Sequence, residues 1–336
     1  MSGRAFQRTR LGRRLVFAAA LGAVGCGIGI VGSEPPPVSD ADAGREGGFR
    51  DPSPPVDAPT GDAPLLCDGA PPDTSENCGA CGRDCAGGAC DAGTCAPIDL
   101  VVVPADQTVR AVAVNGDGLY YLTEQSRTIV RTALDGGGPT DVLTSADATQ
   151  QIAVDDTYLW YTSTSLWRAS TDGSDPVALA VGSYGCVSVD PSKTVVYAAD
   201  FDGDRIISVP YGGGLASDIL TADAGVESPW GVAANATDIF FTTSDGGSGS
   251  IATHPKDGDG GTITLKTGQP TPNCLTFDED GRLYWANYGD GTIHRSKADG
   301  GDAVVLATGQ TAVTQLAIDA KFYYWGTGNA VRRLAR

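Results

Sequence analysis

An aromatic triplet recurs six times in the C-terminal part of the chain. The copies read LYY, LWY, VVY, IFF, LYW and YYW and begin at Leu119, Leu159, Val195, Ile239, Leu283 and Tyr323. Each copy follows a short alternating run that ends in Asp or Asn, and the runs begin at Val112, Ile152, Val187, Val232, Leu275 and Leu316. These starting points are 40, 35, 45, 43 and 41 residues apart. Such a period is typical of repeat architectures, in which each unit packs against its neighbours.

Each copy carries strand signals beyond the triplet. A polar hairpin leads to a third strand, such as TIVRT from Thr128 or TIHRS from Thr292. Five copies then add a Gly-rich turn and a fourth strand, such as AVVLATG from Ala303. The chain of 336 residues contains 46 Gly and 20 Pro but one Met, a composition rich in turn formers. The pattern predicts an all-β, six-bladed β-propeller of four-stranded blades over residues 98–336.

The sixth copy ends at Arg336, directly after its third strand. The missing strand is found at the start of the domain, where IDLVVVPADQTVR at 98–110 aligns with AVVLATGQTAVTQ of the fifth copy. Pairing these two ends of the domain would close the ring and remove the free edges of an open sheet. We therefore expect the first strand of the domain to complete the last blade.

The copy LYWANYGDGTIHRSKADGG, residues 283–301, resembles the YWTD repeat of low-density-lipoprotein-receptor-type propellers. The whole set, over roughly residues 98–336, is similar to bacterial propeller lipoproteins with the same blade. The resemblance implies the propeller architecture. The fourth motif position departs from the Asp of the receptor family, so the partners of the receptors do not carry over; it is occupied by Thr123, Ser163, Ala199, Thr243, Asn287 and Thr327.

The first 26 residues have the pattern of an export signal. Basic residues precede an apolar run from Leu15 to Val24, which is too short to span a bilayer, and small residues lead to Cys26. The segment resembles a bacterial lipoprotein signal, in which such a Cys is lipidated; an ordinary export signal cut nearby is the alternative. We predict an exported protein, lipid-anchored through Cys26 at the outer membrane, the cell surface or the periplasm.

Residues 27–64 read as a disordered linker. From Ser33 onward this stretch is rich in Pro and Asp, with seven acids against two bases and few aliphatic residues. Such a composition does not bury enough apolar surface to fold. The segment is expected to act as a tether between the anchor and the folded part.

Residues 65–97 form a Cys-rich module, and the run NCGACGRDC resembles small modules of exported myxobacterial proteins. Its cysteines are Cys67, Cys78, Cys81, Cys85, Cys90 and Cys95. In an exported chain they predict disulfides that hold a module too small for its own core. The alternative is a metal site built on Cys78 and Cys81 with two later thiolates. The spacing does not choose among the possible pairings.

Two further cysteines stand at equivalent positions in blades three and five. Sheets packed about 10 Å apart would place next-nearest inner strands roughly 17 Å apart, whereas a disulfide needs Cα atoms about 5.5 to 6 Å apart. We therefore predict that Cys186 and Cys274 are two unlinked thiols near the channel.

The charge of the chain limits its partners. The formal net charge of −18 offers nothing to neutralise a phosphate backbone, which excludes nucleic acid. We expect a monomer whose partner is a protein, a glycan or a small ligand, with membrane contact only through the lipid anchor. No cofactor is predicted.

A ligand site is best sought among residues that break the six-fold pattern. Trp230 is the one aromatic residue directly before an inner-strand start, and aromatic residues also occur in two loops that join second to third strands. Because these loops share one face, we predict an aromatic and acidic patch that suits a cationic or sugar-like ligand. The candidate residues are Trp230, Tyr184, Phe201, Tyr288, Glu227, Asp200 and Asp202. The alternative is that Trp230 packs on Pro229 and covers the channel.

Three function classes follow from this reading: a binding module, a structural envelope protein, and a lactonase- or lyase-like propeller enzyme. Such enzymes carry carboxylates or His at the starts of the inner strands. Here those positions are Ala111, Gln151, Cys186, Gly231, Cys274 and Gln315. His254 and His294 are expected to be exposed strand residues, and the alternating acids of DFDGDR to form a turn rather than a calcium loop. No catalytic or metal-binding residue is predicted, and the binding module is favoured.

Overall fold

The computed structural model describes residues 74–336 apart from 146 and 245–246. The predicted signal with Cys26, the linker at 27–64 and Cys67 therefore lie outside the described residues. Within the described part, no helix has the length and apolar character needed to cross a membrane.

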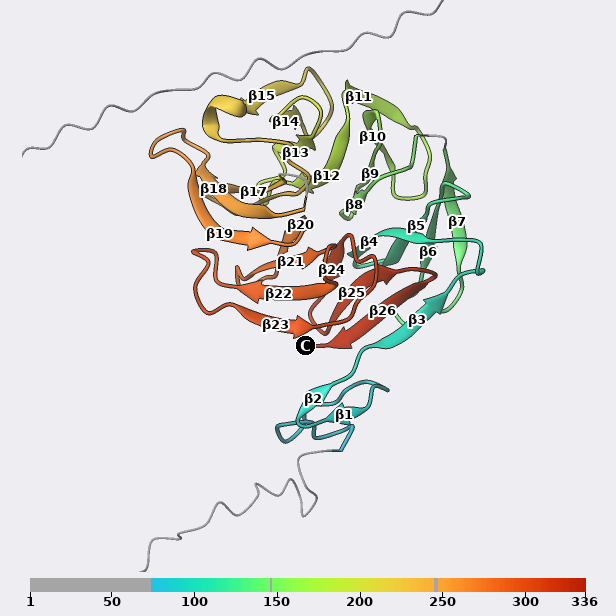
Figure 1. The fold of residues 1–336 in the computed structure, drawn as a ribbon. Coiled ribbons are helices and arrows are strands. Elements are labelled where there is room, and N and C mark those ends of the chain that lie inside the picture. Colours follow the sequence, from blue (N-terminus) through green and yellow to red (C-terminus); the bar gives the residue numbers. More distant parts are fainter. Residues whose placement is uncertain (1–73, 146, 245–246) are drawn as a thin grey trace, which may run out of the picture. The chain divides into compact units, whose positions relative to one another are not determined.

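The repeats form a ring of six four-stranded antiparallel sheets in the described part of the chain, as the sequence predicts (Figure 1). Blade one contains β4 (Val109–Asn115), β5 (Gly118–Thr123), β6 (Thr128–Thr132) and β7 (Thr140–Thr144). Blade two contains β8 (Ile152–Val154), β9 (Tyr158–Thr162), β10 (Ser165–Ser170) and β11 (Val177–Val181). Blade three contains β12 (Tyr184–Val189), β13 (Val195–Asp200), β14 (Arg205–Pro210) and β15 (Ser217–Leu220).

The remaining blades follow the same order from the inner to the outer strand. Blade four contains β16 (Val232–Ala234), β17 (Asp238–Ser244), β18 (Gly249–Pro255) and β19 (Ile263–Gln269). Blade five contains β20 (Pro272–Phe277), β21 (Leu283–Asn287), β22 (Thr292–Ser296) and β23 (Val304–Ala307). Blade six contains β24 (Leu316–Ile318), β25 (Phe322–Thr327), β26 (Ala330–Ala335) and β3 (Ile98–Val102). A short 3-10 helix, Ala222–Ala224, is the helical element of the described residues.

The ring closes through β3, which pairs antiparallel with β26 (Figure 1). Val101 lies opposite Val331 and Ile98 opposite Arg333. Asp99 accepts a hydrogen bond from Arg332 Nε at 2.7 Å, which fixes the register further. The predicted closure of the last blade by the first strand is confirmed.

The aromatic triplets build the core between neighbouring blades. Successive residues of a strand point to opposite faces, so each triplet supplies side chains to both of its neighbours. Tyr120 and Leu122 of blade one, for example, pack in one buried cluster with Leu159 and Tyr161 of blade two. The recurrence therefore belongs to the scaffold.

The recurrent Asp after each inner strand ties blades together as well as capping a turn. Asp155 Oδ1 accepts the backbone N–H groups of Thr157 and Tyr158, while Oδ2 accepts the hydroxyl of Tyr211 from blade three at 2.6 Å. Burial by itself raises the pKa of Asp155, but these hydrogen bonds and that from Lys193 outweigh it and hold the pKa below its usual range. In the same way Asp190 binds Lys256 of blade four.

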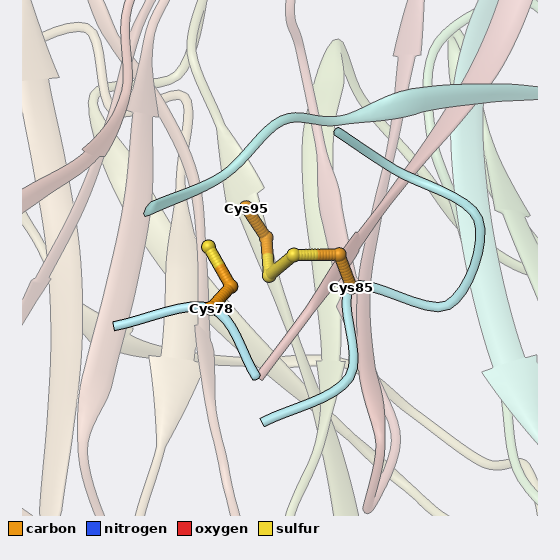
Figure 2. A group of neighbouring side chains, drawn as sticks. All are labelled: Cys78, Cys85 and Cys95. Carbon is orange, nitrogen blue, oxygen red and sulfur yellow. A yellow bond between two sulfur atoms is a disulfide. The ribbon is translucent and has the colours of Figure 1, made fainter. Parts of the chain in front are cut away.

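The Cys-rich module contains a small hairpin, β1 (Cys90–Asp91) and β2 (Thr94–Cys95). Disulfides join Cys78 to Cys90 and Cys85 to Cys95, and Cys81 is disulfide-bonded as well. The sulfur atoms of Cys78, Cys85 and Cys95 lie within 4.8 Å of one another (Figure 2). Because these sulfurs form disulfides, they are not thiolate ligands for a metal. The disulfide interpretation of this segment is confirmed for these residues.

Candidate functional site

The inner strands lie around the axis of the ring, and residues at or near their starts form contacts between blades that are not adjacent. Gln315 of blade six donates a hydrogen bond from Nε2 to the carbonyl of Ile152 in blade two at 2.7 Å. On the other side of the axis, Cys186 and Cys274 form a disulfide between blades three and five. Each of these two contacts therefore joins blades that are separated by one other blade.

The disulfide shows that the prediction of two unlinked thiols was wrong. The Cα atoms of Cys186 and Cys274 are 5.7 Å apart, not roughly 17 Å. The error lies in the 10 Å spacing, which applies to sheets packed face to face and not to the inner ends of blades that converge on an axis. Here the backbone N–H of Cys186 donates to the carbonyl of Trp230 in the next blade at 2.8 Å. Gly231 occupies the position between the two cysteines, and a Cβ there would lie 2.4 Å from the carbonyl oxygen of Asn273.

A cavity of about 400 Å³, called the loop-face cavity below, is lined by residues of blades one, three, four, five and six. Residues at or just before the starts of inner strands line it together with residues of the second-to-third-strand loops, so the two sets share a face as predicted. Three aromatic side chains contribute, Phe201 from blade three, Trp230 from blade four and Tyr288 from blade five. The remaining lining residues are Arg110, Ser228, Ser244, Thr271, Pro272, Asn273 and Thr314.

The aromatic wall is ordered by contacts between blades. The rings of Phe201 and Trp230 lie 5.0 Å apart between centroids and are tilted by 30°. Tyr288 is 46% exposed and stands at the rim. Phe201 follows the last residue of β13 and Trp230 precedes β16 by two residues, so both side chains are held at the ends of strands. An aromatic wall of this kind provides a flat apolar surface for a ring.

Arg110 reaches the cavity from blade one. Its guanidinium carbon lies 6.0 Å from the centroid of the Trp230 ring. Nη2 donates to Gln150 Oε1 at 2.7 Å, and the Thr314 hydroxyl donates to the carbonyl of Arg110, so both ends of the residue are fixed. Among the described residues, no carboxylate forms an ion pair with this guanidinium.

Several buried side-chain amides have at least one polar atom without a hydrogen-bond partner among the described residues. Gln151 is 0% exposed, and neither polar atom of its side chain has a hydrogen-bond partner. Asn273, which lines the cavity, is 6% exposed and its Oδ1 has no donor. An unsatisfied buried acceptor is costly, so Asn273 Oδ1 favours a ligand or solvent molecule that donates a hydrogen bond.

The structure brings together three of the seven predicted site residues, Trp230, Phe201 and Tyr288. Tyr184 does not join them, because it is 1% exposed and packs among Trp160 and Leu166 in the blade core. Burial raises the pKa of Tyr184 to about 12. Its sequence position suggested a loop, but it is the first residue of β12 and its side chain points into the sheet interface.

The predicted acidic part of the patch is also absent from the described lining of the cavity. Asp200 is buried and pairs with Arg205, whose Nη2 lies 2.8 Å from Oδ2. Asp202 is exposed in the turn between β13 and β14 and accepts the Ser183 hydroxyl at 2.6 Å. Glu227 is exposed beside the 3-10 helix. These carboxylates serve turns or face solvent.

Sequence reasoning did not single out Arg110, Asn273 and Thr314. All three occupy the repeat position that Trp230 holds in blade four, which in the structure lies at the start of an inner strand or two residues before it. The signal that identified Trp230, departure from six-fold repetition, applied to them equally. These residues were missed because only aromatic residues at this position were considered as ligand contacts.

The two histidines lie elsewhere and are half-buried, not exposed as predicted. His294 stacks on Trp285 with centroids 4.9 Å apart, and its Nε2 lies 2.7 Å from the Thr292 hydroxyl. Burial lowers the pKa of His294. His254 Nδ1 lies 3.1 Å from the Thr262 hydroxyl. Neither ring lines the cavity.

A separate cavity of about 210 Å³ is lined by inner-strand residues, among them Val112, Ile152, Val187 and Leu275, and by Gln315. The two cavities share no lining residue. The loop-face cavity and the inner-strand cavity are therefore two separate sites.

Comparisons with known proteins support the fold. No protein-family model and no curated protein sequence matches the chain. Among solved structures, the chain is similar to a gluconolactonase from Xanthomonas campestris, with 14% identity, 71% of this chain and 88% of that chain covered, and a TM-score of 0.58. It is similar to the virginiamycin B lyase of Staphylococcus aureus at 11% identity, with 72% and 98% covered and a TM-score of 0.54. A nidogen/laminin complex matches at 21% identity, with 65% and 83% covered and a TM-score of 0.52.

Proposed function

We propose that this protein is an exported binding module that holds a small ligand, or a ring of a glycan, in the loop-face cavity. The observation that carries the proposal is the cavity itself, which aromatic side chains from three blades line together. Its volume of about 400 Å³ lies in the range of ligand sites, which run roughly from 300 to 1,000 Å³. The structural neighbours include two enzymes and a protein complex, so the fold alone does not choose a function.

The chemistry of the lining favours binding over catalysis. The described lining offers a guanidinium, hydroxyls, an amide and aromatic rings. These groups hold and orient a ligand, whereas general acid–base catalysis requires a group that exchanges a proton near the working pH. A structural role explains the contact between Phe201 and Trp230, but it gives no partner to the buried Oδ1 of Asn273 among the described residues.

The proposal also includes the cellular location of the protein. The disulfides of the described residues indicate an extracellular or periplasmic location. We propose that Cys26 carries a lipid anchor, that residues 27–64 form the tether, and that the Cys-rich module at 65–97 precedes a monomeric propeller at 98–336. Replacing Cys26 by Ser should then release the chain from the membrane fraction; a variant that stays there would contradict the anchor.

The binding proposal is tested by screening the full chain against a glycan array and a library of small ring compounds, with tryptophan fluorescence as the readout. Ligands that bind the wild type should lose most of their affinity for Trp230→Ala and Phe201→Ala. Leu215→Ala is a suitable control, because Leu215 is 91% exposed and lies outside the cavity. Hits that bind Trp230→Ala as tightly as the wild type would overturn this assignment of the site.

A further inference from the structure

We infer that the loop-face cavity selects an anionic ring compound, a carboxylate attached to a flat ring that also bears a hydrogen-bond donor. The inference rests on the proposed function, because it names the ligand class of the same cavity. It replaces the cationic or sugar-like ligand that the sequence suggested.

The charge of the ligand follows from Arg110. The chain carries a net charge of −18, and among the described residues Arg205, Arg282, Arg332 and Arg336 form ion pairs with carboxylates, but Arg110, which lines the cavity, forms none. The side chain is half-buried beside aromatic rings, where solvent screens its charge less than at an open surface. A carboxylate of the ligand would supply the missing counter-ion and form charge-assisted hydrogen bonds with the guanidinium.

The unpaired hydrogen-bond donors at the site also favour a negatively charged ligand. Arg110 Nε and Trp230 Nε1 are buried and have no acceptor among the described residues. Anionic oxygens are strong acceptors for N–H groups. A cationic ligand would instead bring further donors to a site that already has an excess of them.

The surface that would attract a cationic ligand is already next to a positive charge. The ring face of Trp230 could attract a cation, but the guanidinium of Arg110 already lies 6.0 Å from its centroid. The carboxylates that were expected to help, those of Asp200, Asp202 and Glu227, do not line the cavity. Repulsion by Arg110 would therefore weaken the binding of an amine.

The other residues that line the cavity indicate that the ligand has a ring and a hydrogen-bond donor. Phe201 and Trp230 form the flat surface, with Tyr288 at the rim, which suits stacking with an aromatic or sugar ring. Asn273 Oδ1 is an acceptor without a donor and calls for a hydroxyl or N–H group on the ligand. Two sources share this chemistry, a hydroxylated aromatic acid and a uronic acid.

The first experiment uses the wild-type full chain and isothermal titration calorimetry at low ionic strength. One series compares 4-hydroxybenzoate with the neutral 4-hydroxybenzamide and the cationic 4-hydroxybenzylamine; the other compares glucuronate with glucose and glucosamine. We expect the anion of at least one series to bind about tenfold or more tightly than its neutral analogue, and the amine to bind most weakly. The series that binds identifies the source of the ring.

The second experiment uses Arg110→Met and Arg110→Lys. Binding of the anion should fall by about 10- to 100-fold in Arg110→Met and be partly restored in Arg110→Lys, which keeps the charge but loses the planar fork. Arg131→Met is the matched control, because it makes the same charge change in blade one outside the cavity. Circular dichroism verifies that the variants are folded, and the wild-type series tests the inference even if one is not.

The outcomes separate this inference from the proposed function. Equal binding of anion and neutral analogue, or no binding of either anion at millimolar concentration, would overturn the anionic class. Library ligands that depend on Trp230 would still support the binding module in that case. If the library ligands bind Trp230→Ala as tightly as the wild type, the proposed binding function of this cavity fails, whatever the charge of those ligands.

Discussion

The repeated positions of the propeller and the positions around its axis follow opposite rules. In the triplets, the third residue is an aromatic side chain that is buried in every blade; these residues are Tyr121, Tyr161, Tyr197, Phe241, Trp285 and Trp325. At the repeat position where each inner strand begins, the six blades carry six different residues, Arg110, Gln150, Gly185, Trp230, Asn273 and Thr314. A position that packs against the next blade meets the same surroundings six times, so one solution recurs. At the axis six positions meet one another, so each residue is selected for a different neighbour.

The difference teaches where function can be sought in a repeat protein. Stability lies in contacts that recur, because each blade needs them to bury its faces. Specific chemistry lies where the symmetry is broken, since a ligand is one object and six equivalent sites are not needed for it. The following predictions test this division, in order of expected effect.

Removing the closing strand should have the largest effect, because it breaks the repeated scaffold itself. Deletion of residues 98–104 removes β3 and leaves β26 with an unpaired edge. We expect aggregation or loss of the cooperative thermal transition, measured by differential scanning calorimetry and light scattering. Deleting seven residues from the predicted linker, 40–46, is the control. A monomeric variant that melts like the wild type would refute the role of closure.

Two tryptophans offer a matched comparison of scaffold and axis. Trp285 is 1% exposed between blades, so Trp285→Ala should cost about 3–5 kcal/mol of unfolding free energy. Trp230 is half-buried at the cavity, and its replacement should cost roughly 1–2 kcal/mol, mainly through the lost contact with Phe201. Urea denaturation measures both values. Equal losses, or a larger loss for Trp230→Ala, would contradict the division of roles.

The disulfide between Cys186 and Cys274 is expected to contribute no more to the free energy of unfolding than Trp285 does. Cys186 and Cys274 are 88 residues apart in sequence, so their bridge restricts a long loop of the unfolded chain. The double variant Cys186→Ala/Cys274→Ala should lose about 2–4 kcal/mol and still fold as a ring. Thiol titration of the unfolded, unreduced wild type should find no free thiol from this pair. Detection of both thiols there would disprove the bridge.

The smallest expected effect is a pH dependence from His294. Burial lowers the pKa of its imidazole below the ordinary 6.5, so the folded state favours the neutral ring stacked on Trp285. The stability from this preference is present above pH 6.5 and is lost as the pH falls through the lower folded value. Between pH 7.5 and 5 we expect the melting temperature of the wild type to drop by roughly 1–3 °C more than that of His294→Gln. Parallel curves for wild type and His294→Gln would refute the prediction.

The sequence by itself determined the features that depend on local pattern. The alternating runs, the aromatic triplets and the Asp turns each act within one blade or between neighbours, and they recur often enough to be recognised. Closure by residues 98–102 was predictable for the same reason, because a missing fourth strand and a spare strand are both visible in the repeat. Phe201, Trp230 and Tyr288 could be selected as candidates because they interrupt that repeat.

Only the tertiary structure decided what happens where the six blades meet. The disulfide of Cys186 and Cys274 and the approach of Arg110 to Trp230 join blades that are not adjacent, across an axis whose width no local pattern encodes. The burial of Tyr184 likewise depends on one register position at the start of β12. Strand pattern fixes which residues belong to a blade, but distances at the axis arise from the convergence of all six blades. The sequence could therefore propose an aromatic site, and the packed ring was needed to show that Arg110 lines it and that the three predicted carboxylates do not.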